Sequence, residues 1–279
     1  MTTESRWDWS IAHHATFDGV SDYSNHNPLE LIVQRDALRG AAEDRKAMAA
    51  RRFVCRELIQ GLTSAAQVLK FVGGVFGEDR VNGSSPFGNG SDSIASVGRL
   101  SDAAASLIGG ASSLLDQHNV YAASALNRQL VEVEYLAWAF SEDLEEAASW
   151  LRSTRDERMS RWQPKHLRRR AEGRFRATDY SEHCEMGGHP SPAGLRVLLS
   201  SEPTPMIVEV TLRETVHHGS STWDYLKSAI GNICHDVGQD FCTFIPADQD
   251  DAITNALAAW QAVDRVGPIW RSIQDDDSK

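Results

Sequence analysis

Apolar residues recur at helical spacing along most of this chain, and that pattern predicts a protein built from helices. Between residues 120 and 140 the apolar positions follow i, i+3 and i+4 steps along one face, namely Ala123, Leu126, Leu130, Val133 and Ala137. Further amphipathic stretches predict helices at residues 28–62, 94–117, 142–151, 165–175, 221–245 and 247–271. We therefore expect an all-α fold, a multi-helix bundle of about six to nine helices without a substantial sheet.

Glycines and capping residues predict where some of these helices begin and end. Gly40 and Gly61 are expected to divide the first helical stretch into two or three helices. Residues 78–93 are rich in Gly, Ser and Asn, which predicts a loop. Ser91 or Ser93 is then in place to cap the helix that follows this loop.

One stretch, residues 206–218, is compatible with either a strand or a helix. Val208, Val210 and Leu212 alternate with polar residues, as they would in a strand. We favour a helix that ends at Gly219, because no other segment offers a partner strand.

The pattern divides the chain into four regions. Residues 1–27 predict an irregular N-terminal arm, and residues 28–93 a helical N-terminal region with the Gly/Ser-rich loop at its end. Residues 94–273 form the main helical bundle, which contains a basic segment at residues 152–176, and residues 274–279 form an acidic tail.

The bulk composition indicates a globular protein rather than a membrane or secreted one. Of its 279 residues, 41% are hydrophobic and 24% are charged, which is ordinary for a soluble domain. No run of about 18 apolar residues predicts a membrane span, and the N-terminus lacks the pattern of a secretory signal. Four cysteines without CxxC spacing indicate reduced thiols rather than disulfides or a zinc ribbon. We therefore expect a cytoplasmic protein.

Charge is distributed unevenly, and the basic segment 152–176 carries +7 in a chain of net charge −11. Such a segment marks a binding site for an anion, which can be phosphate, RNA, DNA or an acidic partner. The candidate nucleic-acid-binding side chains are Arg161, Lys165, Arg168, Arg169, Arg170 and Arg174. Trp162 and Phe175 lie among them and could stack on bases. The alternative is a solvated helix face that pairs with the acidic run at residues 142–146 or with an acidic protein partner.

Arg176 and His183 are the leading candidates for catalysis. They are two helical turns apart, so on a helix they would share a face, with Asp179 and Tyr180 on the turn between them. An arginine can hold a phosphate bidentately, and a histidine can move a proton near neutral pH. Together they suffice for metal-independent RNA cleavage. The alternative is a surface arginine and a histidine that packs beside Gly187.

An all-α bundle with an Arg-x6-His element resembles the HEPN superfamily. Many HEPN proteins are ribonucleases of toxin–antitoxin and antiphage defence systems, and they often act as dimers that join two motifs in one cleft. The resemblance implies that Arg176 binds phosphate, that His183 is the acid or base, and that a second copy of the chain is a partner. Ala177 stands where many members carry Asn, Asp or His.

A second resemblance covers roughly residues 120–260. Arg128 and Glu132 on one helix, and His189 before a proline, are similar to the polar positions of an uncharacterised family of bacterial all-helical proteins. That family implies a fold and shared polar positions rather than an activity. Arg128 and Glu132 are spaced to form an ion pair within their helix. They would form a site if they met His183 or His189 across the bundle.

Histidine, cysteine and carboxylate side chains also leave a metal enzyme open as an alternative. Ligand types for zinc or iron occur at His183, Cys184 and His189, and downstream at His217, His218 and His235. The spacing of the first three matches no zinc motif. Glu214 and His217 make a single Glu-x-x-His pair, where a di-iron bundle has two. The leading prediction therefore includes no metal and no cofactor.

Three functions follow from these observations. The first is a HEPN-like, metal-independent endoribonuclease or RNA-binding module with a toxin or defence role. The second is a non-catalytic helical protein whose basic segment docks an acidic partner. The third is a metal-binding helical-bundle enzyme.

Overall fold

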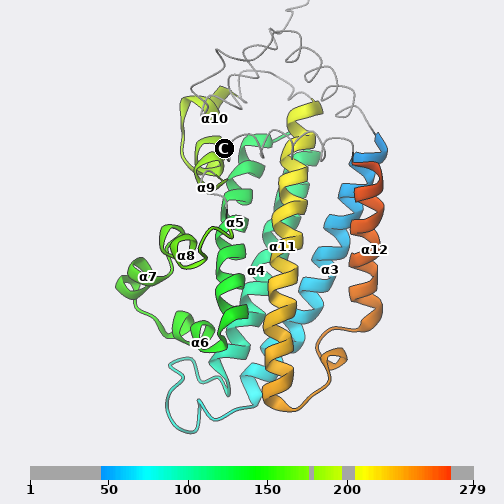
Figure 1. Cartoon of the computed structure of the whole chain (residues 1–279). Coiled ribbons are helices and arrows are strands. Elements are labelled where there is room, and N and C mark those ends of the chain that lie inside the picture. The colour runs from blue at the N-terminus through cyan, green and yellow to red at the C-terminus, as the bar shows by residue number, and fades with distance from the viewer. Residues whose placement is uncertain (1–44, 176–178, 197–204, 265–279) are drawn as a thin grey trace, which may run out of the picture.

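The computed structural model describes residues 45–175, 179–196 and 205–264, and the regular secondary structure of this part of the chain is all helical, without a strand. Five long helices lie side by side in Figure 1: α3 (Arg45–Val75), α4 (Asp92–Asp116), α5 (Val120–Glu142), α11 (Pro205–Val237) and α12 (Ala247–Val263). The predicted all-α multi-helix bundle is confirmed. The predicted N-terminal arm, the acidic tail and Gly40 lie outside the described residues.

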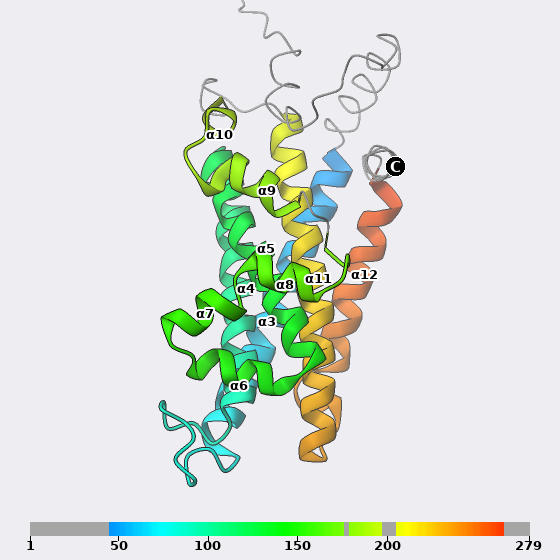
Figure 2. The same ribbon diagram turned by 60° about the vertical axis from the view of Figure 1, so that its left-hand side comes forward.

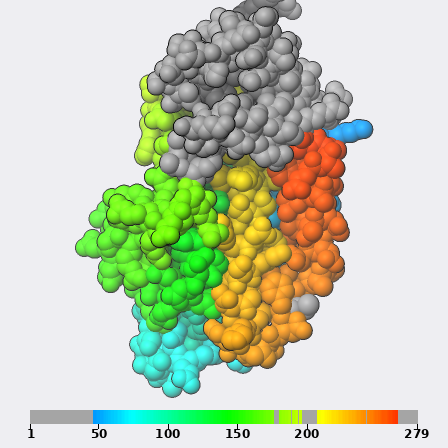
Figure 3. Space-filling model, in the orientation of Figure 1, coloured from blue at the N-terminus to red at the C-terminus, as the bar shows by residue number. Residues whose placement is uncertain are grey.

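Short helices line the outer side of α5 (Figure 2). They are α6 (Leu144–Arg152), α7 (Arg155–Arg161), α8 (Pro164–Arg170), α9 (Asp179–His183), the π-helical turn η2 (Cys184–Gly188) and α10 (Pro192–Arg196). A 3₁₀ turn, η4 (Phe241–Thr243), precedes α12. In Figure 3 the segment from α6 to α8 forms a shoulder beside the surface of α11 and α12.

The core runs through the contacts between the long helices. Trp223, Tyr135 and Phe140 are among its largest fully buried side chains. Residues 206–218 belong to α11, so the predicted helix is confirmed there. Within the described ranges, no helix combines the length and the hydrophobicity that a bilayer span requires.

Two glycines that were predicted to end helices lie inside them instead. A Cβ atom on Gly61 would lie 2.6 Å from Ile253 Cδ1, and one on Gly219 would lie 3.0 Å from Ile108 Cδ1. The missing side chains therefore allow α3 and α11 to approach their neighbours closely, and both helices continue through glycine despite its intrinsic helical cost of about 1 kcal/mol.

Local capping chemistry sets the boundaries of α4 and α6. Ser91 caps α4 as predicted, and its hydroxyl accepts a hydrogen bond from the Ile94 amide. The predicted helix at residues 142–151 begins slightly later, because the Asp143 side chain accepts from the Glu145 amide and so caps α6. Glu142 is the last residue of α5.

Candidate functional site

Two histidines and a carboxylate converge where α9 packs beside α11. His183 Nε2 on α9 lies 3.1 Å from His218 Nε2 on α11. Glu214 Oε2, one turn before His218 on α11, lies 3.8 Å from His183 Nε2 and 3.6 Å from His218 Nε2. Atoms from helices far apart in the sequence thus meet at one point.

A second carboxylate, from α5, fixes the orientation of His218. Glu134 Oε2 lies 2.6 Å from His218 Nδ1, and both side chains are buried. An ionised carboxylate can only accept a hydrogen bond, so Nδ1 carries the proton and donates it. This tautomer leaves the Nε2 lone pair of His218 facing His183 and Glu214.

The third group, Glu214, is held in its ionised form. Burial alone would raise the pKa of Glu214, but the imidazole of His218 at 3.6 Å, and then the imidazoles of His183 and His217, outweigh burial and lower the pKa well below its ordinary value of 4.5. Its other oxygen, Oε1, lies 3.6 Å from Arg213 Nη1. Glu214 therefore presents a negative oxygen to both histidines at neutral pH.

This geometry matches the ligand set of a metal ion. Nitrogen and oxygen ligands bound at 2.0–2.2 Å to one tetrahedral ion lie roughly 3.3–3.6 Å apart, close to the observed separations of 3.1, 3.6 and 3.8 Å. A proton shared between the two imidazoles would explain the contact between His183 and His218. A carboxylate also pairs with such a positively charged imidazole pair, so the three separations fit either a shared proton or a bound metal cation.

The sequence directed attention to His183 and, within a Glu-x-x-His pair, to Glu214. His183 was predicted as an acid or base partnered by Arg176, which lies outside the described residues. In the structure, His183 faces His218 and Glu214 instead. The side chain of Asp179 also lies outside the described residues. His189 has an exposed ring, and its backbone oxygen accepts a hydrogen bond from Tyr121 (3.4 Å).

Beside the histidines, Arg128, Glu132 and Tyr180 form a closed polar triangle. The predicted ion pair within α5 is confirmed, with Arg128 Nη2 2.9 Å from Glu132 Oε1. Arg128 Nη2 donates to the Tyr180 hydroxyl (2.7 Å), which donates to Glu132 (2.9 Å). Arg128 Nε also contacts Cys184 Sγ at 3.4 Å. The two α5 residues thus meet Tyr180 and Cys184, rather than the imidazoles of His183 or His189.

The basic segment is partly neutralised within the protein. Arg161 and Arg170 pair with Glu146 at 2.9 and 3.2 Å, as the alternative reading of this segment predicted. Trp162 donates to the same carboxylate and is buried. Phe175 packs on Tyr135 with ring centroids 4.1 Å apart. Both aromatic side chains therefore pack against the protein, and base stacking by them stays a prediction.

The other candidate cations lie on or near α8. Lys165, Arg169 and Arg174 are exposed. The guanidinium of Arg168 lies 5.9 Å from the centre of the Tyr180 ring. Part of the basic segment therefore adjoins α9, the helix that carries His183.

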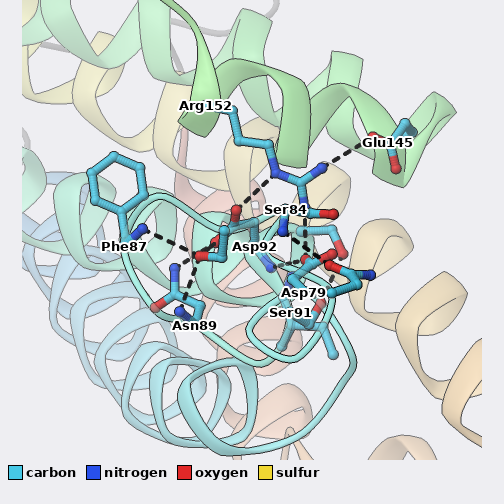
Figure 4. A network of polar contacts seen from close by, with 12 residues as sticks. Asp79, Ser84, Phe87, Asn89, Ser91, Asp92, Glu145 and Arg152 are labelled. Atoms are coloured by element: carbon cyan, nitrogen blue, oxygen red, sulfur yellow. Dashed lines mark hydrogen bonds and ion pairs between the residues drawn. The ribbon is translucent and has the colours of Figure 1, made fainter.

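A second buried polar cluster holds the loop between α3 and α4 (Figure 4). Arg152 Nε donates to Asp92 Oδ2 (2.8 Å), and its Nη2 pairs with Asp79 (2.7 Å). Asp92 Oδ1 accepts from Ser85 and Asn89, both at 2.7 Å. Arg152, the first residue of the basic segment, thus joins α6 to this loop.

Glu134 was not singled out from the sequence, and His218 was named only among the downstream histidines. The Glu-x-x-His pair of Glu214 and His217 drew attention to an i, i+3 spacing. The residue that meets Glu214 is His218 at i+4, whereas His217 is exposed. The available signal was the spacing of Glu134, which follows the buried Leu130 by four residues and so lies on the same face of the helix. A buried carboxylate there needs a polar partner.

No protein-family model, no curated protein and no solved structure matches the chain significantly.

Proposed function

We propose that this protein is a metal-dependent enzyme that binds one divalent transition-metal ion through His183, Glu214 and His218. The observation that supports the proposal is the convergence of these three side chains from α9 and α11, within 3.8 Å of one another. Glu134 supports it further, because a carboxylate that accepts from the second nitrogen of a ligand histidine is the usual outer partner of a metal-bound imidazole.

The ligand set favours a catalytic rather than a purely structural ion. Two imidazoles and one carboxylate suit Zn²⁺ or Fe²⁺. Structural zinc sites are commonly closed by four protein ligands, whereas catalytic sites keep a position for water or substrate. With three protein ligands, the ion would activate a bound water or polarise a substrate oxygen.

Metal content is the direct test. Purified full-length protein is stripped with a chelator, reloaded with Zn²⁺ or with Fe²⁺ under reducing conditions, and analysed for bound metal. We expect about one ion per chain in the wild type and loss of that ion in His218→Ala and Glu214→Gln.

His217→Ala is the matched control, because His217 adjoins His218 in sequence but is exposed. It should retain the ion. Wild-type protein that holds neither metal after loading, or equal loss in the His217 and His218 variants, contradicts the proposal.

Endoribonuclease activity is a second proposal, supported by the position of Arg168 over Tyr180 beside α9. RNA cleavage is measured in EDTA and with added metal, in the wild type and in Arg176→Ala and His183→Ala. Cleavage in EDTA that both variants lose supports HEPN-like, metal-independent chemistry. Cleavage only with metal makes RNA the substrate of the metal centre. No cleavage in either condition favours the protein whose basic segment docks an acidic partner.

We further propose a cytoplasmic location. Cys55, Cys184 and Cys234 are free thiols, which suits a reducing compartment. Thiol counting in protein trapped directly from its native cells tests this, and oxidised cysteines would contradict it.

A further inference from the structure

The helix that carries His183 is too short to set its own orientation. α9 spans five residues, Asp179–His183, and continues directly into η2. A helix of this length gains little from its own hydrogen bonds, so contacts with the rest of the bundle determine where it lies. The direction of the His183 ring therefore depends on what anchors α9.

Arg128 on α5 anchors α9 on both sides of His183. Its Nη2 donates to the hydroxyl of Tyr180, three residues before the histidine, at 2.7 Å. Its Nε contacts the sulfur of Cys184, the next residue after the histidine, at 3.4 Å. The guanidinium also lies 5.3 Å from the centre of the Tyr180 ring. One side chain thus holds two neighbours of His183.

Glu132 completes this anchor. It accepts from the Tyr180 hydroxyl at 2.9 Å and pairs with Arg128 at the same distance. Burial, and then the hydrogen bond to Glu132, raise the pKa of Tyr180 to about 12. The phenol consequently keeps its proton at neutral pH and can donate to the carboxylate.

The backbone of η2 provides a second fixed point. A Cβ atom on Gly187 would lie 2.5 Å from the Ala125 nitrogen and 2.6 Å from the Ser124 carbonyl carbon. The turn therefore sits directly against α5 and fixes the end of the segment that follows His183. The part before His183 is held through Tyr180.

We infer that Tyr180 is a positioning residue for the metal centre, and that its bonds to Arg128 and Glu132 aim His183 Nε2 at His218 and Glu214. This inference rests on the proposed metal-binding function. It gives the polar triangle on α5 and α9 a role in metal affinity, although none of its members is a ligand.

Tyr180→Phe is the test, because it removes one hydroxyl and keeps the ring. We expect metal affinity to fall about tenfold, the low end of the range for lost outer partners of a metal ligand, while one ion per chain still binds at saturation. Arg128→Gln removes the contacts with both Tyr180 and Cys184 and should weaken binding more. Affinity is measured by competition with a chelator of known affinity.

Tyr121→Phe is the matched control. Tyr121 lies on α5 and also donates its hydroxyl to the α9–η2 region, to the backbone oxygen of His189 beyond Gly187. Loss of that bond should change affinity less than about twofold, since His183 is held by Tyr180. The visible spectrum of bound Co²⁺, which reports ligand geometry, should change in Tyr180→Phe and not in Tyr121→Phe.

The outcomes separate this inference from the proposed function. Wild-type protein without metal overturns the proposed function and this inference with it. Wild-type protein that binds metal, with unchanged affinity and an unchanged Co²⁺ spectrum in Tyr180→Phe, overturns the inference alone. An equal loss of affinity in the two tyrosine variants also overturns it, because the effect would then be general docking of α9–η2.

Discussion

Two clusters of charged and polar side chains lie in different parts of the bundle, and they are built differently. The loop cluster joins α6 to the loop between α3 and α4 (Figure 4), and the histidine cluster joins α9 to α11 and α5. In the loop cluster, Arg152 supplies a cation to Asp92 and Asp79, and both oxygens of Asp92 accept hydrogen bonds. In the histidine cluster, His183, His218 and Glu214 direct their ligand atoms at one another.

The difference shows how a structural network can be told from a candidate site. Arg152 already occupies the place of a cation between two carboxylates, so the loop cluster is complete and its role is to hold the loop against α6. In the histidine cluster, the Nε2 atoms of His183 and His218 face each other with a carboxylate oxygen beside them. A proton or a metal cation between these atoms satisfies them.

Removal of the Arg152 side chain should have the largest effect on stability. Arg152→Ala leaves the fully buried Asp92 without its charged partner, and we expect the free energy of unfolding to fall by about 3 kcal/mol. Urea unfolding followed by circular dichroism measures it. Arg155→Ala, at an exposed position on α7, should change stability by less than about 0.5 kcal/mol. A loss below about 1 kcal/mol in Arg152→Ala would show that the network does not hold this end of the bundle.

Zinc should stabilise the folded protein only by binding to the histidine cluster. At a free Zn²⁺ concentration of about 100 times the Kd, binding to the folded state adds about 2.7 kcal/mol to the free energy of unfolding. His218→Ala should gain nothing. Arg152→Ala should gain as much as the wild type, because distant sites act additively. If Arg152→Ala lost the zinc-dependent gain, the two clusters would be coupled and the comparison would fail.

Within the histidine cluster, Glu134 should raise metal affinity although it is not a ligand of the ion. Glu134→Gln removes the charged acceptor of His218 Nδ1, and metal affinity should fall 10- to 100-fold, about 1.4–2.7 kcal/mol. Chelator competition measures the affinity. Glu142→Gln, at an exposed position on the same helix, is the control and should leave affinity unchanged. Equal affinities in Glu134→Gln and the wild type would remove Glu134 from the centre.

The fold was predictable because each long helix carries a local signal. The apolar faces of residues 94–117 and 120–140 and the capping serine Ser91 are short-range features, and they match α4 and α5. Gly61 and Gly219 misled for a physical reason. Whether a glycine ends a helix or admits a close neighbour depends on Ile253 and Ile108, which are far away in the sequence.

The candidate site was harder to predict for the same reason. The sequence singled out Arg128, Glu132 and Tyr180 and paired the first two correctly, but that triangle closes only when α9 lies on α5. His183 was found beside the basic segment. Its partner His218 lies 35 residues away in the chain, and Glu134, which contacts His218, lies 49 residues away. Only the packing of three helices brings these residues together.

Low pH should reduce the stability that the loop cluster contributes, and the substitution Asp92→Asn isolates the part that depends on the Asp92 charge. Burial alone would raise the pKa of Asp92, but hydrogen bonds from Arg152, Ser85 and Asn89 outweigh burial and hold it below its ordinary value of 3.8. A lowered folded-state pKa means that Asp92 stabilises the protein above its unfolded pKa and loses this contribution as the pH falls through the folded value.

At pH 7, Asp92→Asn should therefore be less stable than the wild type by about 1–3 kcal/mol, and the difference should shrink progressively below about pH 5. Urea unfolding at a series of pH values measures it. A difference that stays constant down to pH 3 would mean that the charge of Asp92 contributes nothing, and the loop cluster would then be held by its neutral hydrogen bonds alone.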